Sequence, residues 1–323
     1  MSTPCAAGAA YAPAVRTTFV ACALGLLLSG CGLRAEPPAE RLAVAESAAA
    51  SPPAEPSTSS PSPAGAPSPE ASPSPAPTGP ADPLALVGRW HVEAPGVAPG
   101  TALVLGEDLA VFLPCGVLDG SWEADAQQGL FIASSFGGDS TCFSGQASPT
   151  PAWLTAARGF AVEGNRRLLL DADGRGIVRL RPGARPTVGP NRSANAAAEP
   201  AVTPELRARL ADPAPLPREA RPVTAEQLQR RWVPVDVQNP KVHLVFREGG
   251  DYTGSDGCNG EGGRYALGGD GRLIATGGPS TAIGCDGAPV GAWADGAARA
   301  GLVGDQLVLY DRAAEVLGRL RAG

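Results

Sequence analysis

Gly254-Ser255-Asp256-Gly257-Cys258-Asn259 combines a glycine-rich turn with a cysteine. This stretch and the landmarks on either side of it indicate the fold. Glycine supplies the positive φ angles of tight turns, while Asp and Asn side chains satisfy nearby backbone groups. We therefore expect a structural loop that holds Cys258 in place. Binding of a polar ligand through the loop backbone is the alternative. The residues concerned are Gly254, Ser255, Asp256, Gly257 and Asn259.

Regularly spaced landmarks lie on both sides of this loop. Trp232 precedes Cys258 by 26 residues, Tyr265 follows it by seven, and Cys285 follows it by 27. Trp293 then lies in an alanine-rich stretch that we expect to be helical, packed on a core.

The first half of the chain has the same landmarks in the same order. Trp90 precedes Cys115 by 25 residues, Trp122 follows that cysteine by seven, and Cys142 follows it by 27. Trp153 stands where the second half has Trp293. An ordered series of this kind indicates a tandem duplication.

Two segments rich in Pro, Ala and Ser separate the repeats from each other and from the N-terminus. Gly and Pro contribute 42 and 34 residues, so much of the chain is expected to be turn or linker. Such segments bury too little apolar surface to offset the entropy of ordering them. We expect the long second linker to couple the repeats only weakly. The predicted division is signal peptide 1–30, disordered linker 31–82, first repeat 83–181, linker 182–222 and second repeat 223–321.

Strand signals dominate within each repeat. Val242, Leu244 and Phe246 alternate with more polar neighbours, which is the period of a half-buried strand. Gly269-Asp270-Gly271 and Asp173-Gly174 have the composition of hairpin turns. The predicted fold class is mainly β with one helix per domain (α+β), forming two small barrel-like domains.

Helix-start signals stand at three places. Asp82 precedes a proline, and Thr224 with Gln227 forms a capping-box pattern. A third short helix is expected from Pro204 to Leu210 inside the second linker.

The N-terminus has the pattern of an export signal. The apolar run from Phe19 through Leu28 is about half of the roughly 20 residues that a membrane-spanning helix needs. It ends in Leu28-Ser29-Gly30-Cys31, which resembles the lipobox of bacterial lipoproteins. That resemblance implies cleavage before Cys31 and its diacylglyceryl modification, with acyl chains such as palmitate. The expected location is the extracytoplasmic face of a cell membrane, held by lipid. An ordinary signal peptide ending near a cysteine is the alternative.

The four remaining cysteines of the mature chain favour disulfides in an oxidising compartment. Four cysteines allow three pairings, and the equal spacing selects Cys115–Cys142 and Cys258–Cys285. A zinc site is the alternative, although no Cys-x-x-Cys pair is present in the chain.

The second half resembles a META domain, the family of the bacterial heat-shock protein HslJ, over about residues 225–321. The matching features are Trp232, Gly254–Asn259, Gly263-Arg264-Tyr265, Thr281–Cys285 and Leu307-Val308-Leu309. The first half keeps the spacing but has Leu113-Pro114-Cys115-Gly116-Val117 in place of the glycine-rich stretch. It is thus interpreted as a diverged META-like repeat. The resemblance implies a compact β-rich fold common in envelope proteins, and no established catalytic residues.

The residue inventory argues against several function classes. A net charge of −6 without a basic cluster does not suit nucleic-acid binding. His91 and His243 are the only histidines, and no G-x-S-x-G motif is present. We expect a non-enzymatic protein, without metal or cofactor, that binds a partner or maintains the envelope under stress. The alternative is a secreted hydrolase that uses Asp256 or Asp251 with Glu261.

Overall fold

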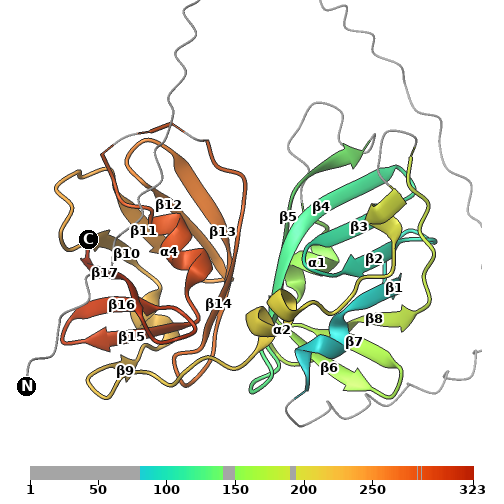
Figure 1. Ribbon diagram of the computed structural model, residues 1–323, viewed down its shortest axis with the longest axis horizontal. Helices are drawn as coiled ribbons and strands as arrows, with labels where there is room; N and C mark the ends of the chain where they lie inside the picture. Colours follow the sequence, from blue (N-terminus) through green and yellow to red (C-terminus); the bar gives the residue numbers. More distant parts are fainter. Residues whose placement is uncertain (1–80, 141–149, 190–193, 282, 285) are drawn as a thin grey trace, which may run out of the picture. The chain divides into compact units, whose positions relative to one another are not determined.

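The computed structural model describes residues 81–140, 150–189, 194–281, 283–284 and 286–323. Its framework is two antiparallel sheets of eight and nine strands (Figure 1). The predicted signal peptide, the linker up to residue 80, and Cys31, Cys142 and Cys285 lie outside the described residues. Within the ranges described, no helix has the length and apolar character needed to cross a bilayer.

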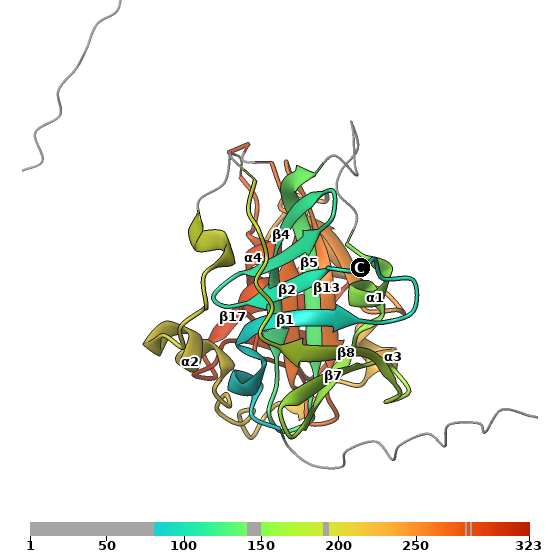
Figure 2. The ribbon, with the colours of Figure 1, turned by 90° about the vertical axis from the view of Figure 1, so that its right-hand side faces the viewer.

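The first sheet has the order β5-β4-β3-β2-β1-β8-β7-β6. Figure 2 shows most of these strands side by side. The strands are β1 (Gly88–Glu93), β2 (Ala102–Leu105), β3 (Leu109–Leu113), β4 (Gly116–Ala124), β5 (Phe131–Ser140), β6 (Gly159–Glu163), β7 (Arg166–Leu170) and β8 (Gly176–Pro182). Helix α1 (Ala152–Ala156) stands between β5 and β6 in the chain, and η1 (Pro83–Leu86) precedes β1.

The second sheet has the equivalent order, β14-β13-β12-β11-β10-β17-β16-β15, with β9 (Arg221–Pro222) added at the β15 edge. Its strands are β10 (Arg231–Pro234), β11 (His243–Phe246), β12 (Asp251–Ser255), β13 (Gly260–Leu267), β14 (Leu273–Gly277), β15 (Arg299–Val303), β16 (Gln306–Tyr310) and β17 (Val316–Ala322). Helices α3 (Ala225–Leu228) and α4 (Val290–Gly296) occupy the places of η1 and α1.

Equivalent side chains make equivalent hydrogen bonds in the two sheets. The indole Nε1 of Trp90 donates to the carbonyl of Leu86 over 2.7 Å, and that of Trp232 donates to Leu228 over 2.9 Å. Each landmark tryptophan therefore ties the first strand of its sheet to the short helix before it. This shared order and bonding supports the predicted duplication, while the domain boundaries themselves stay predictions.

The two sheets are not closed into barrels, which corrects the barrel-like part of the predicted fold. Each sheet is open: in the first, the terminal strands β5 and β6 are joined only by an isolated bridge between Leu130 and Gly159. The corresponding bridge in the second joins Arg272 and Arg299. One bridge at the end of the strands leaves the rest of the ladder unpaired. Helices α1 and α4 pack beside β5 and β14 respectively, and the mainly β part of the prediction is confirmed.

The three expected helix starts are confirmed. Asp82 caps η1 through a 2.9 Å bond from Leu84 N–H, and Thr224 forms a complete capping box with Gln227. Helix α2 spans Pro204–Leu210, and its Leu206 and Leu210 side chains are buried in the first core. The segment predicted as a linker thus contains an element packed against the first sheet.

Each sheet has its own apolar core. Trp122 and Phe131 are completely buried in the first, and Tyr252 and Phe246 occupy the second. Trp153 and Trp293 pack against these two cores, as expected for tryptophans in the helices. The alternating pattern of β11 is also confirmed, with Leu244 and Phe246 buried and His243 only partly so.

The two sheets contact each other reciprocally. Strand β5 packs against β13 and β14, and β4 packs against β14. Ala133 pairs with Trp122 in the first sheet, and Ala275 pairs with Tyr265 in the second. Trp122 and Tyr265 are equivalent landmarks. The residues that follow the two alanines, Ser134 of β5 and Thr276 of β14, are therefore equivalent as well. The hydroxyls of Ser134 and Thr276 lie 2.6 Å apart, so this hydrogen bond lies on a pseudo-two-fold axis. The buried contact contradicts the expectation that a long linker leaves the repeats weakly coupled.

One side of this interface is apolar and the other is charged. Leu130 packs with Ile132, Ala266 and Ile274 on the apolar side. On the charged side Arg272, which is equivalent to Leu130, forms an ion pair with Asp125. The two repeats therefore differ in charge where they meet.

Candidate functional site

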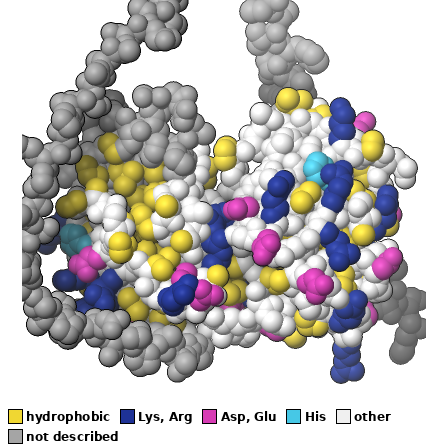
Figure 3. All heavy atoms as spheres, turned by 180° about the vertical axis from the view of Figure 1, so that it is seen from behind, with side chains coloured by type: hydrophobic (Ala, Val, Ile, Leu, Met, Phe, Trp, Pro, Cys, Tyr) yellow, Lys and Arg dark blue, Asp and Glu magenta, His cyan; other side chains and the backbone are white. Residues whose placement is uncertain are grey.

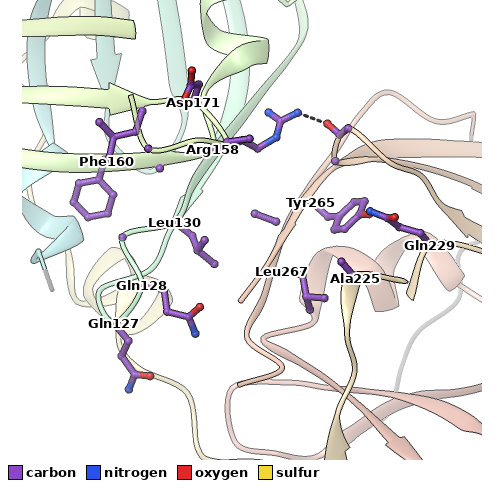
Figure 4. A pocket seen from close by; sticks show the side chains of 18 residues that line it. Gln127, Gln128, Leu130, Arg158, Phe160, Asp171, Ala225, Gln229, Tyr265 and Leu267 are labelled. Atoms are coloured by element: carbon purple, nitrogen blue, oxygen red, sulfur yellow. Dashed lines mark hydrogen bonds between the residues drawn. The ribbon is translucent and has the colours of Figure 1, made fainter. Parts of the chain in front are cut away.

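A cleft of about 610 Å³ opens between the two sheets on the apolar side of their interface (Figure 4). The β4–β5 turn, α1–β6 junction and β7–β8 turn contribute from the first repeat, and α3, the β11–β12 turn and β13 from the second. The side chains labelled in Figure 4 are Gln127, Gln128, Leu130, Arg158, Phe160, Asp171, Ala225, Gln229, Tyr265 and Leu267. Both apolar and hydrogen-bonding groups therefore face one opening.

Arg158 spans the cleft. Its guanidinium donates to the carbonyls of Thr155 and Ala157 over 2.6 and 2.8 Å, and also to Gly249 of the second repeat. Burial lowers the pKa of this guanidinium, although the nearby Asp251 carboxylate opposes the shift. A partly desolvated cation held between two backbone segments is available to an acceptor group on a ligand.

Tyr265 forms the opposite wall. Its hydroxyl donates to the carbonyl of Arg247 over 2.7 Å and accepts from the Gln229 amide over 3.4 Å. Its ring meets Phe246 edge-on with centroids 5.1 Å apart. Burial raises the pKa of Tyr265, so its hydroxyl stays protonated at neutral pH. Tyr265 thus supplies a rigid aromatic wall with a fixed polar tip.

Gln128 closes one end of the cleft. Its side-chain amide nitrogen donates to Asp270 over 2.6 Å, and its carbonyl oxygen accepts from Gly269 N–H over 2.9 Å. A Cβ at Gly268 would lie 2.3 Å from the Gln128 side-chain oxygen, so glycine permits this close approach. These contacts fix the β4–β5 turn of the first repeat against the β13–β14 turn of the second.

The cleft has the character of a binding site. Its apolar surface comes from Leu130, Phe160 and Leu267, and its polar groups are amides, a hydroxyl, the Asp171 carboxylate and the Arg158 guanidinium. The lining residues that the structure describes include no Ser, Cys or Lys nucleophile and no histidine. Apolar walls with a few convergent polar groups are typical of ligand pockets.

The glycine-rich loop lies away from this cleft, between β12 and β13. Asp256 accepts hydrogen bonds from Cys258 N–H, Asn259 N–H and the Asn259 amide over 2.8, 2.6 and 2.6 Å. These bonds lower the pKa of Asp256. Gly257 has φ +112°, a conformation that favours glycine.

Asn259 ties this loop to the following segment. Its side chain is buried, its amide nitrogen donates to Ile283 O over 2.8 Å, and its oxygen accepts from Ile283 N–H over 2.8 Å and Thr281 Oγ1 over 2.5 Å. Ser255 Oγ accepts from Gly257 N–H over 3.1 Å. The polar side chains of the motif therefore bind the protein itself, which favours the structural interpretation.

The acidic residues of the hydrolase alternative are only partly brought together. Asp256 lies in the loop, Asp251 is exposed at the start of β12, and Glu261 is partly buried on β13. Burial raises the pKa of Glu261. Tyr252 donates to Asp295, a carboxylate that the sequence did not single out. Neither histidine lines the cleft: His91 is exposed, and His243 contacts the Lys241 carbonyl.

Cys115 lies between β3 and β4, and Cys258 lies at the equivalent turn between β12 and β13. Their predicted partners are outside the described residues, so the two disulfide pairings stay predictions. Within the described part of the chain, no group of three His, Cys, Asp or Glu side chains could hold a metal ion.

Arg158 has no motif that marks it as a site residue. It ends an Ala-Ala-Arg stretch, as Arg299 does in the second half, but the two arginines are not equivalent in the structure. Arg158 N–H donates to the carbonyl of Leu170, the last residue of β7, and Ala298 N–H donates to that of Tyr310, the last residue of the equivalent strand β16. Arg158 therefore corresponds to Ala298. The cleft arginine is therefore specific to the first repeat, and the other cleft residues come from turns without a motif.

Figure 3 shows the protein from behind, and acidic and basic side chains are interspersed on this face.

Comparison with known proteins identifies no relative: no family model, curated protein or solved structure matches this chain.

Proposed function

We propose that the chain is a lipid-anchored, extracytoplasmic binding protein whose two META-like repeats hold a polypeptide segment in the cleft between them. The sequence Leu28-Ser29-Gly30-Cys31 supports the anchor, and the resemblance of residues 225–321 supports the family. The role is non-enzymatic, in binding or in envelope maintenance under stress. The choice of a polypeptide ligand rests on one observation. The pseudo-two-fold axis relates the cleft to a counterpart on the charged side of the interface, and a segment of the chain itself already fills that counterpart.

The counterpart follows from the strand registers and matching turns. Asp171 and Asp311, for example, accept the same pair of turn N–H groups at 2.8–2.9 Å. The cleft residues Tyr265, Ala266, Leu130, Gly159 and Ala172 correspond to Trp122, Glu123, Arg272, Arg299 and Arg312.

Helix α2 and the residues after it lie along this counterpart. The Arg209 guanidinium lies over the Trp122 ring at 5.6 Å and 3.5 Å from the Glu123 carboxylate. Arg312 donates to Ala211 O, and Arg299 donates to Ala214 O over 2.7 Å. The remaining hollow there is about 310 Å³, half the volume of the open cleft.

The cleft would take a segment of different composition. The counterpart has four charged residues, Glu123, Arg272, Arg299 and Arg312. At the equivalent positions the cleft has Ala266, Leu130, Gly159 and Ala172, so the lining of the cleft carries less charge. An apolar side chain would pack against Leu130 and Leu267. A backbone carbonyl or carboxylate would accept from Arg158. The ligand is thus an apolar peptide segment with one acceptor group near its centre.

Site-specific photocrosslinking in intact cells tests this ligand class. A photoreactive residue at position 267 lies in the cleft, whereas one at Val316, which is 45% exposed, lies outside it. A defined polypeptide adduct is expected at position 267 only, and Ala172→Trp should abolish it by filling the rim. Equal adducts at both positions, or an adduct insensitive to Ala172→Trp, would contradict the proposal.

Detergent partitioning tests the anchor separately. Wild type should enter the detergent phase, and Cys31→Ala should remain in the aqueous phase because no acyl chains are attached. Equal partitioning of the two proteins would sink the lipoprotein assignment while leaving the cleft proposal intact.

A further inference from the structure

Arg264 is a buried cation whose Nε and Nη2 atoms have no hydrogen-bond partner among the described residues. Its side chain lies on β13 and is only 5% exposed. Asp251, which is exposed, is opposite it in the strand register. A guanidinium removed from water without acceptors is costly, and a bound ion is one explanation for such a group in a native structure.

Arg264 lines a second hollow, of about 470 Å³, that shares no residue with the cleft. Ser135 and Thr150 of the first repeat also line it. The Thr150 hydroxyl accepts from Ser135 N–H over 3.0 Å and from Ser135 Oγ over 3.1 Å. With both of these bonds accepted, the Thr150 hydroxyl proton is free to be donated into the hollow.

The Arg264 guanidinium keeps its charge in the hollow. Desolvation lowers the pKa of Arg264 to about 10, and the neighbouring Arg158 adds to this effect while Asp251 opposes it, so the guanidinium is still charged at neutral pH. Asp251, which is opposite Arg264 in the strand register, and Glu261 also line the hollow. Asp251 is exposed and its charge is screened by water, and burial raises the pKa of Glu261. Arg264 is the one cation among the described residues that line this hollow.

The first repeat lacks this cation. Ser121 pairs with Ser134 in the first sheet, and Arg264 pairs with Thr276 in the second. Because Ser134 and Thr276 are equivalent, Ser121 is the residue equivalent to Arg264. Because the fold accepts a small neutral residue at position 121, an arginine is not needed there to build the sheet. The charge at position 264 calls for a separate explanation.

We propose that Arg264 and the Thr150 hydroxyl form a site for a small oxyanion, a carboxylate or a phosphate group, in this hollow. The planar guanidinium offers two adjacent donors, which suit a two-oxygen acceptor. The site is independent of the proposed function and of the peptide cleft.

Thermal unfolding of the full mature chain in detergent tests the site. Inorganic phosphate and acetate, each added against chloride at matched ionic strength, should raise the Tm of wild type by mass action on the folded state. Arg264→Ser, which places the residue of the first repeat there, should lose that rise without lowering the Tm measured in chloride. Arg166→Ser, at an exposed strand position, should keep the rise.

Arg264→Met provides a second variant if the serine protein fails to fold. A response to phosphate alone or to acetate alone identifies which group the site takes, and either response supports it. No rise in wild type with either anion, or the same rise in Arg264→Ser and Arg264→Met, overturns the proposal.

Discussion

Asp125 and Arg272 form an ion pair between the two repeats, with 2.8 Å between carboxylate Oδ2 and guanidinium Nε. Both side chains are almost completely buried. Asp125 follows β4 of the first repeat and Arg272 precedes β14 of the second. The positions equivalent to them across the pseudo-two-fold axis are Gly268 and Leu130. The pair is therefore a one-sided addition to a symmetric contact.

Breaking this pair from one side should be costly. Asp125→Ala leaves Arg272 buried without its anion, and we expect a loss of about 3–5 kcal/mol of unfolding free energy. Arg272→Leu leaves Asp125 in the same state. Urea denaturation of each single variant gives the value.

The double variant Asp125→Ala with Arg272→Leu should be much less damaged than the sum of the singles. It removes both charges and restores at position 272 the leucine that stands at position 130. Additive losses in the double-mutant cycle would show that the pair is not energetically coupled.

Glu123 predicts a pH-dependent stability. Burial raises its pKa to about 7, against the attraction of Arg209, Arg312 and Arg272. In the unfolded chain the carboxyl has a pKa near 4.5. Between these values the unfolded state gives up its proton while the folded state keeps it, so stability falls as pH rises from about 4.5 to about 7.

Glu123→Gln keeps the neutral form at every pH and is the matched control. The unfolding free energy of wild type minus that of Glu123→Gln should be more negative at pH 8 than at pH 5. Guanidinium denaturation of both proteins at the two pH values measures it, and a pH-independent difference would contradict the raised pKa.

Ala314 has φ +66° and is the only residue other than glycine with positive φ in the described ranges. Its equivalent in the first repeat is Gly174, with φ +77°, in the same turn. Ala314→Gly should therefore stabilise the protein by roughly 0.5–1 kcal/mol, because it removes the left-handed strain of a Cβ. Gly174→Ala should destabilise it by a similar amount, and thermal melting of the two variants gives both signs.

The predicted Cys258–Cys285 bridge should stabilise the second repeat by about 3–4 kcal/mol in the chain-entropy model. Cys258→Ser with Cys285→Ser should lower the melting temperature, and the buried interface should transmit part of that loss to the first repeat. Non-reducing peptide mapping gives the direct evidence. Recovery of a Cys115–Cys258 crosslink would refute the pairing within repeats.

The sequence was sufficient to predict features with local chemical signatures. Asp82 and Thr224 cap helices because their side-chain oxygens reach N–H groups two or three residues on. The Trp, Cys and aromatic spacing predicted that the two halves repeat one plan, and the equivalent strand orders of the two sheets support it. The turn at Asp173-Gly174 was predicted from its composition in the same way, and Gly174 N–H donates there to the Asp171 carbonyl.

The candidate sites could not be predicted because they depend on packing between repeats. Arg158 and Tyr265 are 107 residues apart and meet only because β5 packs against β13. Arg264 was noted only as part of a family motif, and nothing local indicates that its guanidinium is buried. The open sheets were also missed, since strand periodicity does not say whether the terminal strands pair.

The unequal sides of the pseudo-two-fold contact disfavour the pairing of like repeats from two copies of the chain. Two first repeats meeting through this face would bury two Asp125 carboxylates opposite Leu130, with no cation. Two second repeats would bury two Arg272 guanidiniums opposite Gly268, with no anion. Only unlike repeats satisfy both charges, and the connecting segment supplies the unlike repeat at high local concentration. At high concentration, such molecules would each remain folded on themselves instead of exchanging halves with their neighbours.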